Sequence, residues 1–76
     1  MTQLNELKNG EEGIIISFNG GQGLINKLNA MGVRTGKKVT VISDSFIGGP
    51  VTIKIATNTV SIGHGMASRI TMEVER

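Results

Sequence analysis

The chain contains no cysteine, tryptophan or tyrosine, and it has a single histidine among its 76 residues. The absence of cysteine excludes disulfides, thiolate metal sites and a cysteine nucleophile. No apolar run approaches the ~18–20 residues that span a bilayer, and the polar stretch from Met1 to Gly10 lacks the apolar core of a signal peptide. We therefore expect a single cytoplasmic domain, residues 1–76, that does not insert into a membrane.

Aromatic side chains and clustered positive charges are also scarce. Phe18 and Phe46 are the only aromatic residues, and the longest basic run is the pair Lys37-Lys38. Eight basic and six acidic residues leave a net charge of +2. A protein that binds single-stranded nucleic acid uses aromatic platforms for the bases and a basic groove for the phosphates. The sequence offers neither feature, so we expect no nucleic-acid binding.

The residues that usually carry catalysis are missing as well. His64 is the only histidine, and no local motif places a base beside any serine or threonine. The glycine-rich stretches 20–23 and 48–49 are not followed by the Gly-Lys-Ser/Thr sequence of a phosphate-binding loop. We therefore predict that the protein is not an enzyme and requires no cofactor.

His64 is also the one weak candidate for a metal ligand, because ferrous iron and related ions prefer imidazole and carboxylate groups. It lies between two glycines and has no histidine or glutamate partner at helical spacing. Weak binding of a divalent transition metal is the most that we expect there. The carboxylates available to such a site are Glu11, Glu12, Asp44, Glu73 and Glu75.

The clearest local pattern lies between residues 24 and 41. Apolar residues at helical spacing, namely Leu24, Ile25, Leu28 and Met31, predict a helix over residues 22–31, for which Asn19 is a candidate N-cap. Gly32 follows at once, and a glycine at this place closes a helix in the left-handed conformation. Val33 can then fold back onto Leu28, as the residue after such a cap often does.

Alternating apolar residues predict five short strands, over residues 13–18, 37–43, 51–55, 59–62 and 69–74. In the first strand we expect Ile14, Ile16 and Phe18 to face the core and Ile15 to face outward. A tight turn is predicted at Thr57-Asn58, with Asn58 at positive φ.

Two short segments complete the core. Leu4 and Leu7 are predicted to plug one end of it, and residues 63–68 are expected to form at most one helical turn around Met66-Ala67. So few residues cannot give a flat sheet with a dry face. We therefore predict a mainly β fold, a small five-stranded barrel capped by the helix over residues 22–31.

Four short motifs extend over nearly the whole chain: Leu4-x-x-Leu7-x-x-Gly10-x-x-Gly13-x-Ile15, Leu28-x-x-Met31-Gly32-x-x-x-Gly36-x-x-Val39-x-Val41, Gly48-Gly49-Pro50-Val51-x-Ile53 and Ala67-x-x-Ile70-x-Met72. Together they resemble the FeoA family, the small cytoplasmic component of bacterial ferrous iron uptake. The resemblance implies an SH3-like β-barrel with one or two short helices, and association with FeoB, a membrane transporter that carries a cytosolic GTPase domain. A related barrel forms the C-terminal domain of iron-dependent repressors, so a regulatory or metal-binding module of that kind is the alternative.

Several apolar residues remain after the inward positions of the strands are filled, namely Ile15, Ile42, Phe46 and Ile47. Exposed apolar clusters on small domains often mark interaction sites. We expect Phe46, Ile47 and Ile42 to contact the transporter, while Lys37 and Lys38 steer the chain toward an acidic surface. In an alternative arrangement Phe46 folds back over an open end of the barrel. Self-association through the same patch or through a free strand edge is a third possibility.

Overall fold

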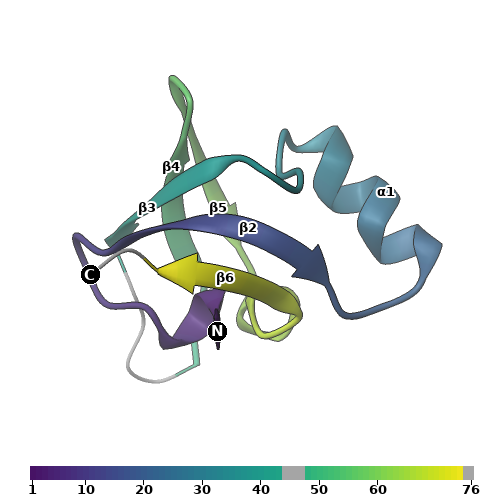
Figure 1. Cartoon of the computed structure of the whole chain (residues 1–76), viewed down its shortest axis with the longest axis horizontal. Coiled ribbons are helices and arrows are strands. Elements are labelled where there is room, and N and C mark those ends of the chain that lie inside the picture. Colours follow the sequence, from purple (N-terminus) through teal and green to yellow (C-terminus); the bar gives the residue numbers. More distant parts are fainter. Residues whose placement is uncertain (44–47, 75–76) are drawn as a thin grey trace.

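The computed structural model describes residues 1–43 and 48–74. Within these residues it contains six strands, two α-helices and one 3₁₀ helix, η1 (Figure 1). In chain order they are β1 (Thr2–Gln3), η1 (Leu4–Glu6), β2 (Glu12–Phe18), α1 (Gln22–Ala30), β3 (Lys38–Ser43), β4 (Val51–Ile55), β5 (Asn58–Ile62), α2 (His64–Ala67) and β6 (Ile70–Val74). None of these helices is long and apolar enough to cross a membrane, among the residues described.

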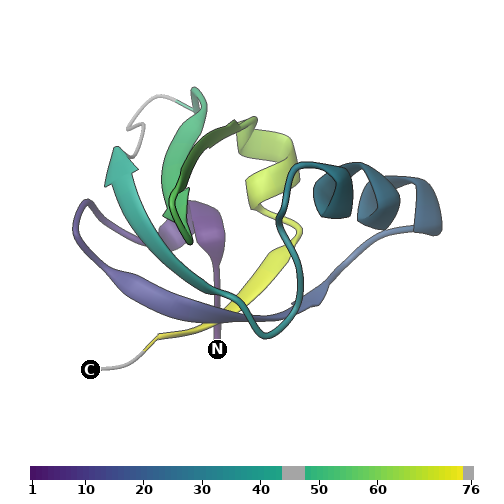
Figure 2. The ribbon, with the colours of Figure 1, turned by 90° about the horizontal axis from the view of Figure 1, so that it is seen from above.

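The strands form one antiparallel sheet in the order β1-β6-β2-β3-β4-β5. The sheet curls around its own interior (Figure 2). η1 packs against α2 and β6. In the chain η1 follows β1 and α2 follows β5, and β1 and β5 are the two edge strands of the sheet. All five predicted strands are present, and the mainly β fold class with short helices is confirmed. β1 was not predicted, because two residues are too few to show an alternating pattern.

Among the described residues, fourteen buried apolar side chains from strands, helices and loops form the core. Leu4 and Leu7 are among them, which confirms that they plug the core. α2 is a single turn, as expected for the glycine-rich segment, and Ala67 points into the core. The full set is Leu4, Leu7, Ile15, Leu28, Val33, Val39, Val41, Val51, Ile53, Ile55, Ile62, Ala67, Ile70 and Met72.

α1 ends as the sequence predicts. Gly32 has φ +86°, its N–H donates to the Asn29 carbonyl at 3.0 Å, and the Val33 N–H donates to the Leu28 carbonyl at 2.9 Å. These bonds are the pair that defines the Schellman motif. Leu28 and Val33 are both fully buried in the core. The other apolar residues of α1 are only partly buried, and the helix projects from one side of the sheet (Figures 1 and 2).

The start of α1 differs from the prediction. Its N-cap is Gly21, which makes no side-chain cap bond, and Asn19 lies two residues earlier. The backbone N–H of Asn19 donates to the Arg69 carbonyl at 2.7 Å, which ties the end of β2 to the start of β6. The prediction that Asn19 caps the helix is therefore wrong, because this bond to β6 holds Asn19 before the helix begins.

The inward face of β2 also differs from the prediction. Ile15 is only 1% exposed and lies in the core, whereas Ile14 and Ile16 are half-buried. The pairing of β2 with β6 shifts register between Ile15 and Ser17, which is a β-bulge. The extra residue at the bulge puts Ile15 and Phe18, three apart in sequence, on the same side. The prediction assumed that every second residue of the strand faces the core, and this assumption cannot place Ile15 and Phe18 on the same side.

The turn between β4 and β5 corrects a third prediction. Ile55 pairs with Asn58, so the connecting loop is Ala56-Thr57. Among the described non-glycine residues, Ala56 alone has a positive φ, of 54°. A positive φ at the first of two central residues is typical of a type II′ turn, which suits the twist of a β-hairpin. Asn58 is thus already in the strand, and the positive φ predicted for it is wrong.

Candidate docking surface

The residues predicted to contact a partner fall into two groups in the structure. Ile42 lies on the outer face of β3 and is 46% exposed, and Lys37 and Lys38 are exposed at the start of that strand. Phe46 and Ile47 lie outside the described residues, so their role stays a prediction. Ile15, which the sequence left available for a partner, is buried in the core and cannot take part.

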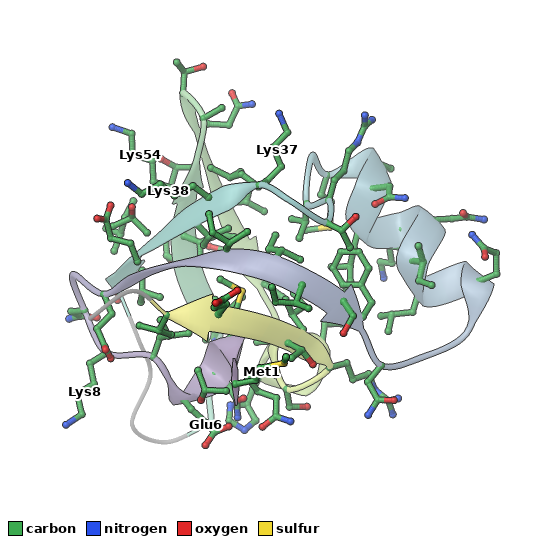
Figure 3. The ribbon with its side chains drawn as sticks, in the orientation of Figure 1. Met1, Glu6, Lys8, Lys37, Lys38 and Lys54 are labelled. Atoms are coloured by element: carbon green, nitrogen blue, oxygen red, sulfur yellow. The ribbon has the colours of Figure 1, made fainter. Side chains whose placement is uncertain are left out.

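The outer face of β3 and β4 brings together cations that are far apart in the sequence. Lys54 of β4 is in register with Thr40 of β3, one outward position along from Lys38. Figure 3 shows Lys37, Lys38 and Lys54 on the same side of the molecule, whereas Lys8 lies at the opposite end. Lys54 was not predicted to belong to this surface, because its place beside Lys38 depends on the pairing of β3 with β4.

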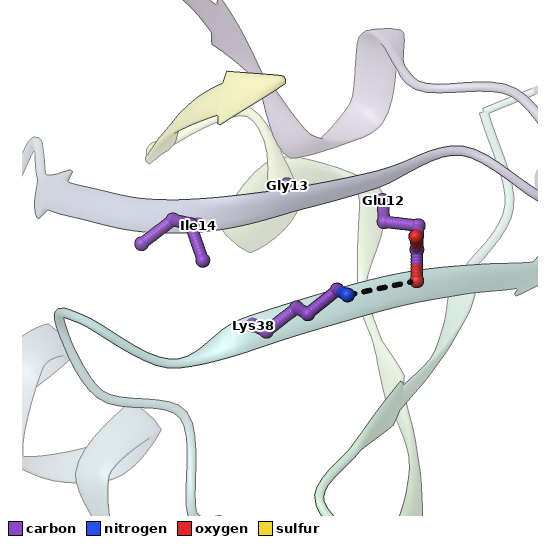
Figure 4. A pocket seen from close by; sticks show the side chains of 4 residues that line it. All are labelled: Glu12, Gly13, Ile14 and Lys38. Carbon is purple, nitrogen blue, oxygen red and sulfur yellow. Dashed lines mark ion pairs between the residues drawn. The ribbon is translucent and has the colours of Figure 1, made fainter. Parts of the chain in front are cut away.

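A shallow hollow where β2 meets β3 is lined by Glu12, Gly13, Ile14 and Lys38 (Figure 4). The Lys38 Nζ lies 3.5 Å from Glu12 Oε2, and the hydroxyl of Thr40 donates to the same oxygen at 3.2 Å. Both charged side chains are more than half exposed, so this pair adds less than ~1 kcal/mol to stability. Its main effect is to hold the Glu12 carboxylate against β3.

Two wider hollows open on the same face. The first holds about 480 Å³ with open solvent included, and its lining is Gly32, Arg34, Lys37, Ile55, Ala56 and Asn58. The second holds about 540 Å³ on the same measure, and its lining is Glu12, Lys38, Thr40, Lys54 and Ala56. Ala56 borders both hollows, so they adjoin. Arg34 thereby becomes a neighbour of this surface, a role that the sequence pattern did not suggest.

The geometry offers little to a metal ion. His64 is exposed at the first position of α2. The described part of the chain contains no group of three or more His, Asp or Glu side chains that could hold a metal. Asp44 and Glu75 lie outside that part. His64 therefore stays a single weak candidate.

Comparison with known proteins gives a consistent result. The family model described as "FeoA domain" matches residues 2–74. A curated relative, "Putative Fe(2+) transport protein A" of Methanocaldococcus jannaschii, is 36% identical over 66 residues, which cover 87% of this chain and 78% of the relative. A crystal structure titled "Iron Uptake Regulatory Protein (FeoA)" superposes with a TM-score of 0.87 at 30% identity, over 97% of this chain and 96% of the other.

The fold also occurs within larger proteins. A manganese-dependent transcriptional repressor in complex with manganese superposes with a TM-score of 0.89, over 97% of this chain and 36% of that chain. Its sequence identity of 17% shows a shared fold and no more. The SH3-like fold implied by the sequence is thus confirmed, and the family match extends from Thr2 to Val74. The chain therefore belongs to the FeoA family.

Proposed function

We propose that the chain is a non-enzymatic, cytoplasmic accessory protein of ferrous iron uptake that binds and modulates a FeoB-type GTPase transporter. The observation that carries this proposal is the FeoA family match over residues 2–74. The name of the M. jannaschii relative, an Fe(2+) transport protein, points to the same process. In this proposal ferrous iron is the cargo of the transporter, and the FeoA chain acts on the transporter rather than on the ion.

The outer face of the sheet supports a docking role. Exposed cations at Lys37 and Lys38 attract an acidic surface over a distance of about one Debye length, which is ~8–10 Å at moderate salt. Ile42 then supplies apolar contact area that water covers in the free protein. Docking at this face would favour one state of the GTPase domain or of the pore over another. An effect of this kind needs different affinities for the two states and no chemistry in the accessory protein.

Binding of the purified chain to the transporter's cytosolic part, measured by pull-down and calorimetry, tests this proposal. We expect Ile42→Ser to weaken binding by ~5-fold or more, because apolar contact area is lost. Ile25→Ser is the matched control, since Ile25 is a partly buried isoleucine on α1, away from β3. The double variant Phe46→Ala/Ile47→Ala tests the remaining two predicted contacts. If the unaltered chain does not bind the cytosolic part, the proposed function is wrong.

A metal-responsive module is the second candidate, because the manganese-dependent repressor shares the fold. Titration of the ¹⁵N-labelled chain with ferrous or zinc ion separates the two. Saturable shifts at His64 at micromolar metal would support the second candidate. Chemical-shift changes at His64 that occur only at millimolar metal would argue against a metal-responsive module and favour docking to the transporter as the function. Sedimentation of the free chain separately tests self-association.

A further inference from the structure

Half of the basic residues of this protein lie around the two wide hollows. Arg34, Lys37, Lys38 and Lys54 are all exposed and all line the two wide hollows, and they make up half of the eight basic residues. Of the carboxylates in the described part of the chain, Glu12 alone lines either hollow. Its Oε2 already faces the Lys38 ammonium and accepts the Thr40 hydroxyl. The face is therefore complementary to negative charge.

The two hollows adjoin at Ala56, which lines both, and together they define a path across this face. One end of the path carries Arg34 and Lys37, and the other end carries Lys38 and Lys54. Ala56 has a φ of 54°, which an alanine adopts only at a cost in backbone energy. Such strain is often retained where it serves a function. Because this residue is alanine, only a methyl group stands where the two hollows adjoin.

The lining indicates what kind of anion fits. Ala56 supplies exposed aliphatic carbon to both hollows, and among the described residues no aromatic side chain lines either of them. Bases of a nucleic acid would find no ring to stack on. An acidic protein segment instead presents carboxylates at intervals along an extended chain, with aliphatic carbons between them. Guanidinium and ammonium groups bind such carboxylates by charge-assisted hydrogen bonds.

We propose that the path from Arg34 to Lys54 across Ala56 is the binding groove for an extended acidic segment of the partner protein. This inference rests on the proposed function and specifies the chemistry of the transporter surface that docks. Lys37 and Lys38 were predicted from the sequence to steer the approach. The groove adds Arg34 and Lys54 as direct contacts and makes Ala56 the position where the segment crosses between the hollows.

Variants at Ala56 provide a matched test. Ala56→Glu places a carboxylate where the two hollows adjoin, while Ala56→Gln adds a side chain of the same length without charge. Ala56 is exposed, and both variants keep a Cβ at the positive φ, so they strain the turn equally. Against the transporter's cytosolic part, Ala56→Glu should weaken binding ~5-fold or more relative to Ala56→Gln. Lys8→Glu, which reverses a charge at the opposite end, should match the unaltered chain.

A second measurement uses a capped hexaglutamate peptide as the probe and the ¹⁵N-labelled chain as the receptor. The largest shifts should fall on Arg34, Lys37, Lys54 and Ala56, and they should fade as salt is raised. Shifts as large at Lys8 and Lys27, or a stronger response to a thymidine hexanucleotide, would overturn the inference. Groove shifts without transporter binding would reject the proposed function but keep the acidic-groove assignment. Transporter binding that ignores Ala56→Glu would reject the groove alone.

Discussion

Replacing Gly32 with valine tests the local signal that ends α1. Gly32 has φ +86°, and a Cβ built there would meet no atom within 4 Å. The loss of stability must therefore come from the backbone rather than from crowding. A left-handed backbone conformation costs a residue with a side chain roughly 1–2 kcal/mol in the folded state. Replacing glycine also reduces the conformational entropy of the unfolded chain, which offsets about 0.4–1 kcal/mol of that cost. We expect net losses of about 1 kcal/mol for Gly32→Ala and about 2 kcal/mol for Gly32→Val, whose branched side chain is more restricted.

Urea denaturation followed by far-UV circular dichroism measures these losses, because the chain has no tryptophan for fluorescence. A loss of 2 kcal/mol would lower Tm by about 10 °C in a domain of this size. Two controls isolate the cause. Gly32→Asn should cost least, since asparagine tolerates the left-handed region. Gly23→Ala, inside α1 with open space around its Cβ, should raise stability by about 0.5 kcal/mol. Equal stability of the Gly32 variants would refute the reasoning.

Four further substitutions test how the sheet is built. Gly13→Ala should destabilise the fold by about 1–3 kcal/mol, because its Cβ would lie 2.8 Å from the backbone oxygen of Glu73, and chemical denaturation measures this. Ala56→Gly should raise stability by about 0.5 kcal/mol by relieving the positive φ; a decrease in Tm would contradict the assigned turn. Ile15→Ala should lower the free energy of unfolding by about 2–4 kcal/mol because Ile15 is buried, whereas Ile42→Ala should lower it by less than about 1 kcal/mol because Ile42 is exposed. A larger loss for Ile42→Ala than for Ile15→Ala would mean that the bulge in β2 is wrongly placed.

Parts of the candidate site followed from the sequence and parts did not. Ile42 and Lys38 were predicted to be exposed because they follow the simple alternation of β3, and the structure agrees. Lys37, which directly precedes β3, is exposed as well. Lys54 is also exposed on an alternating strand, yet nothing in the sequence connects it with Lys38. The connection comes from the register between β3 and β4. The contributions of Phe46 and Ile47 stay predictions.

Local chemistry settled the elements whose causes lie within a few residues of one another. The end of α1 is the best example, since the glycine at position 32 and the apolar residues at 28 and 33 suffice to form the cap. The five longer strands and the single turn of α2 followed from apolar alternation and glycine content in the same way. These features were predictable because short-range sterics and side-chain periodicity cause them.

Pairing between distant segments decided which residues of each strand face the core and which charged side chains become neighbours. β2 pairs with both β3 and β6, and the bulge in its pairing with β6 lies beside Ile15, the isoleucine that is buried. The hairpin from β4 to β5 puts the positive φ on Ala56, and the same hairpin brings Ala56 beside Lys38 and Lys54. A periodic sequence fixes that a strand forms and alternates. Only the hydrogen-bond register with its neighbours fixes which face turns inward and which charges meet.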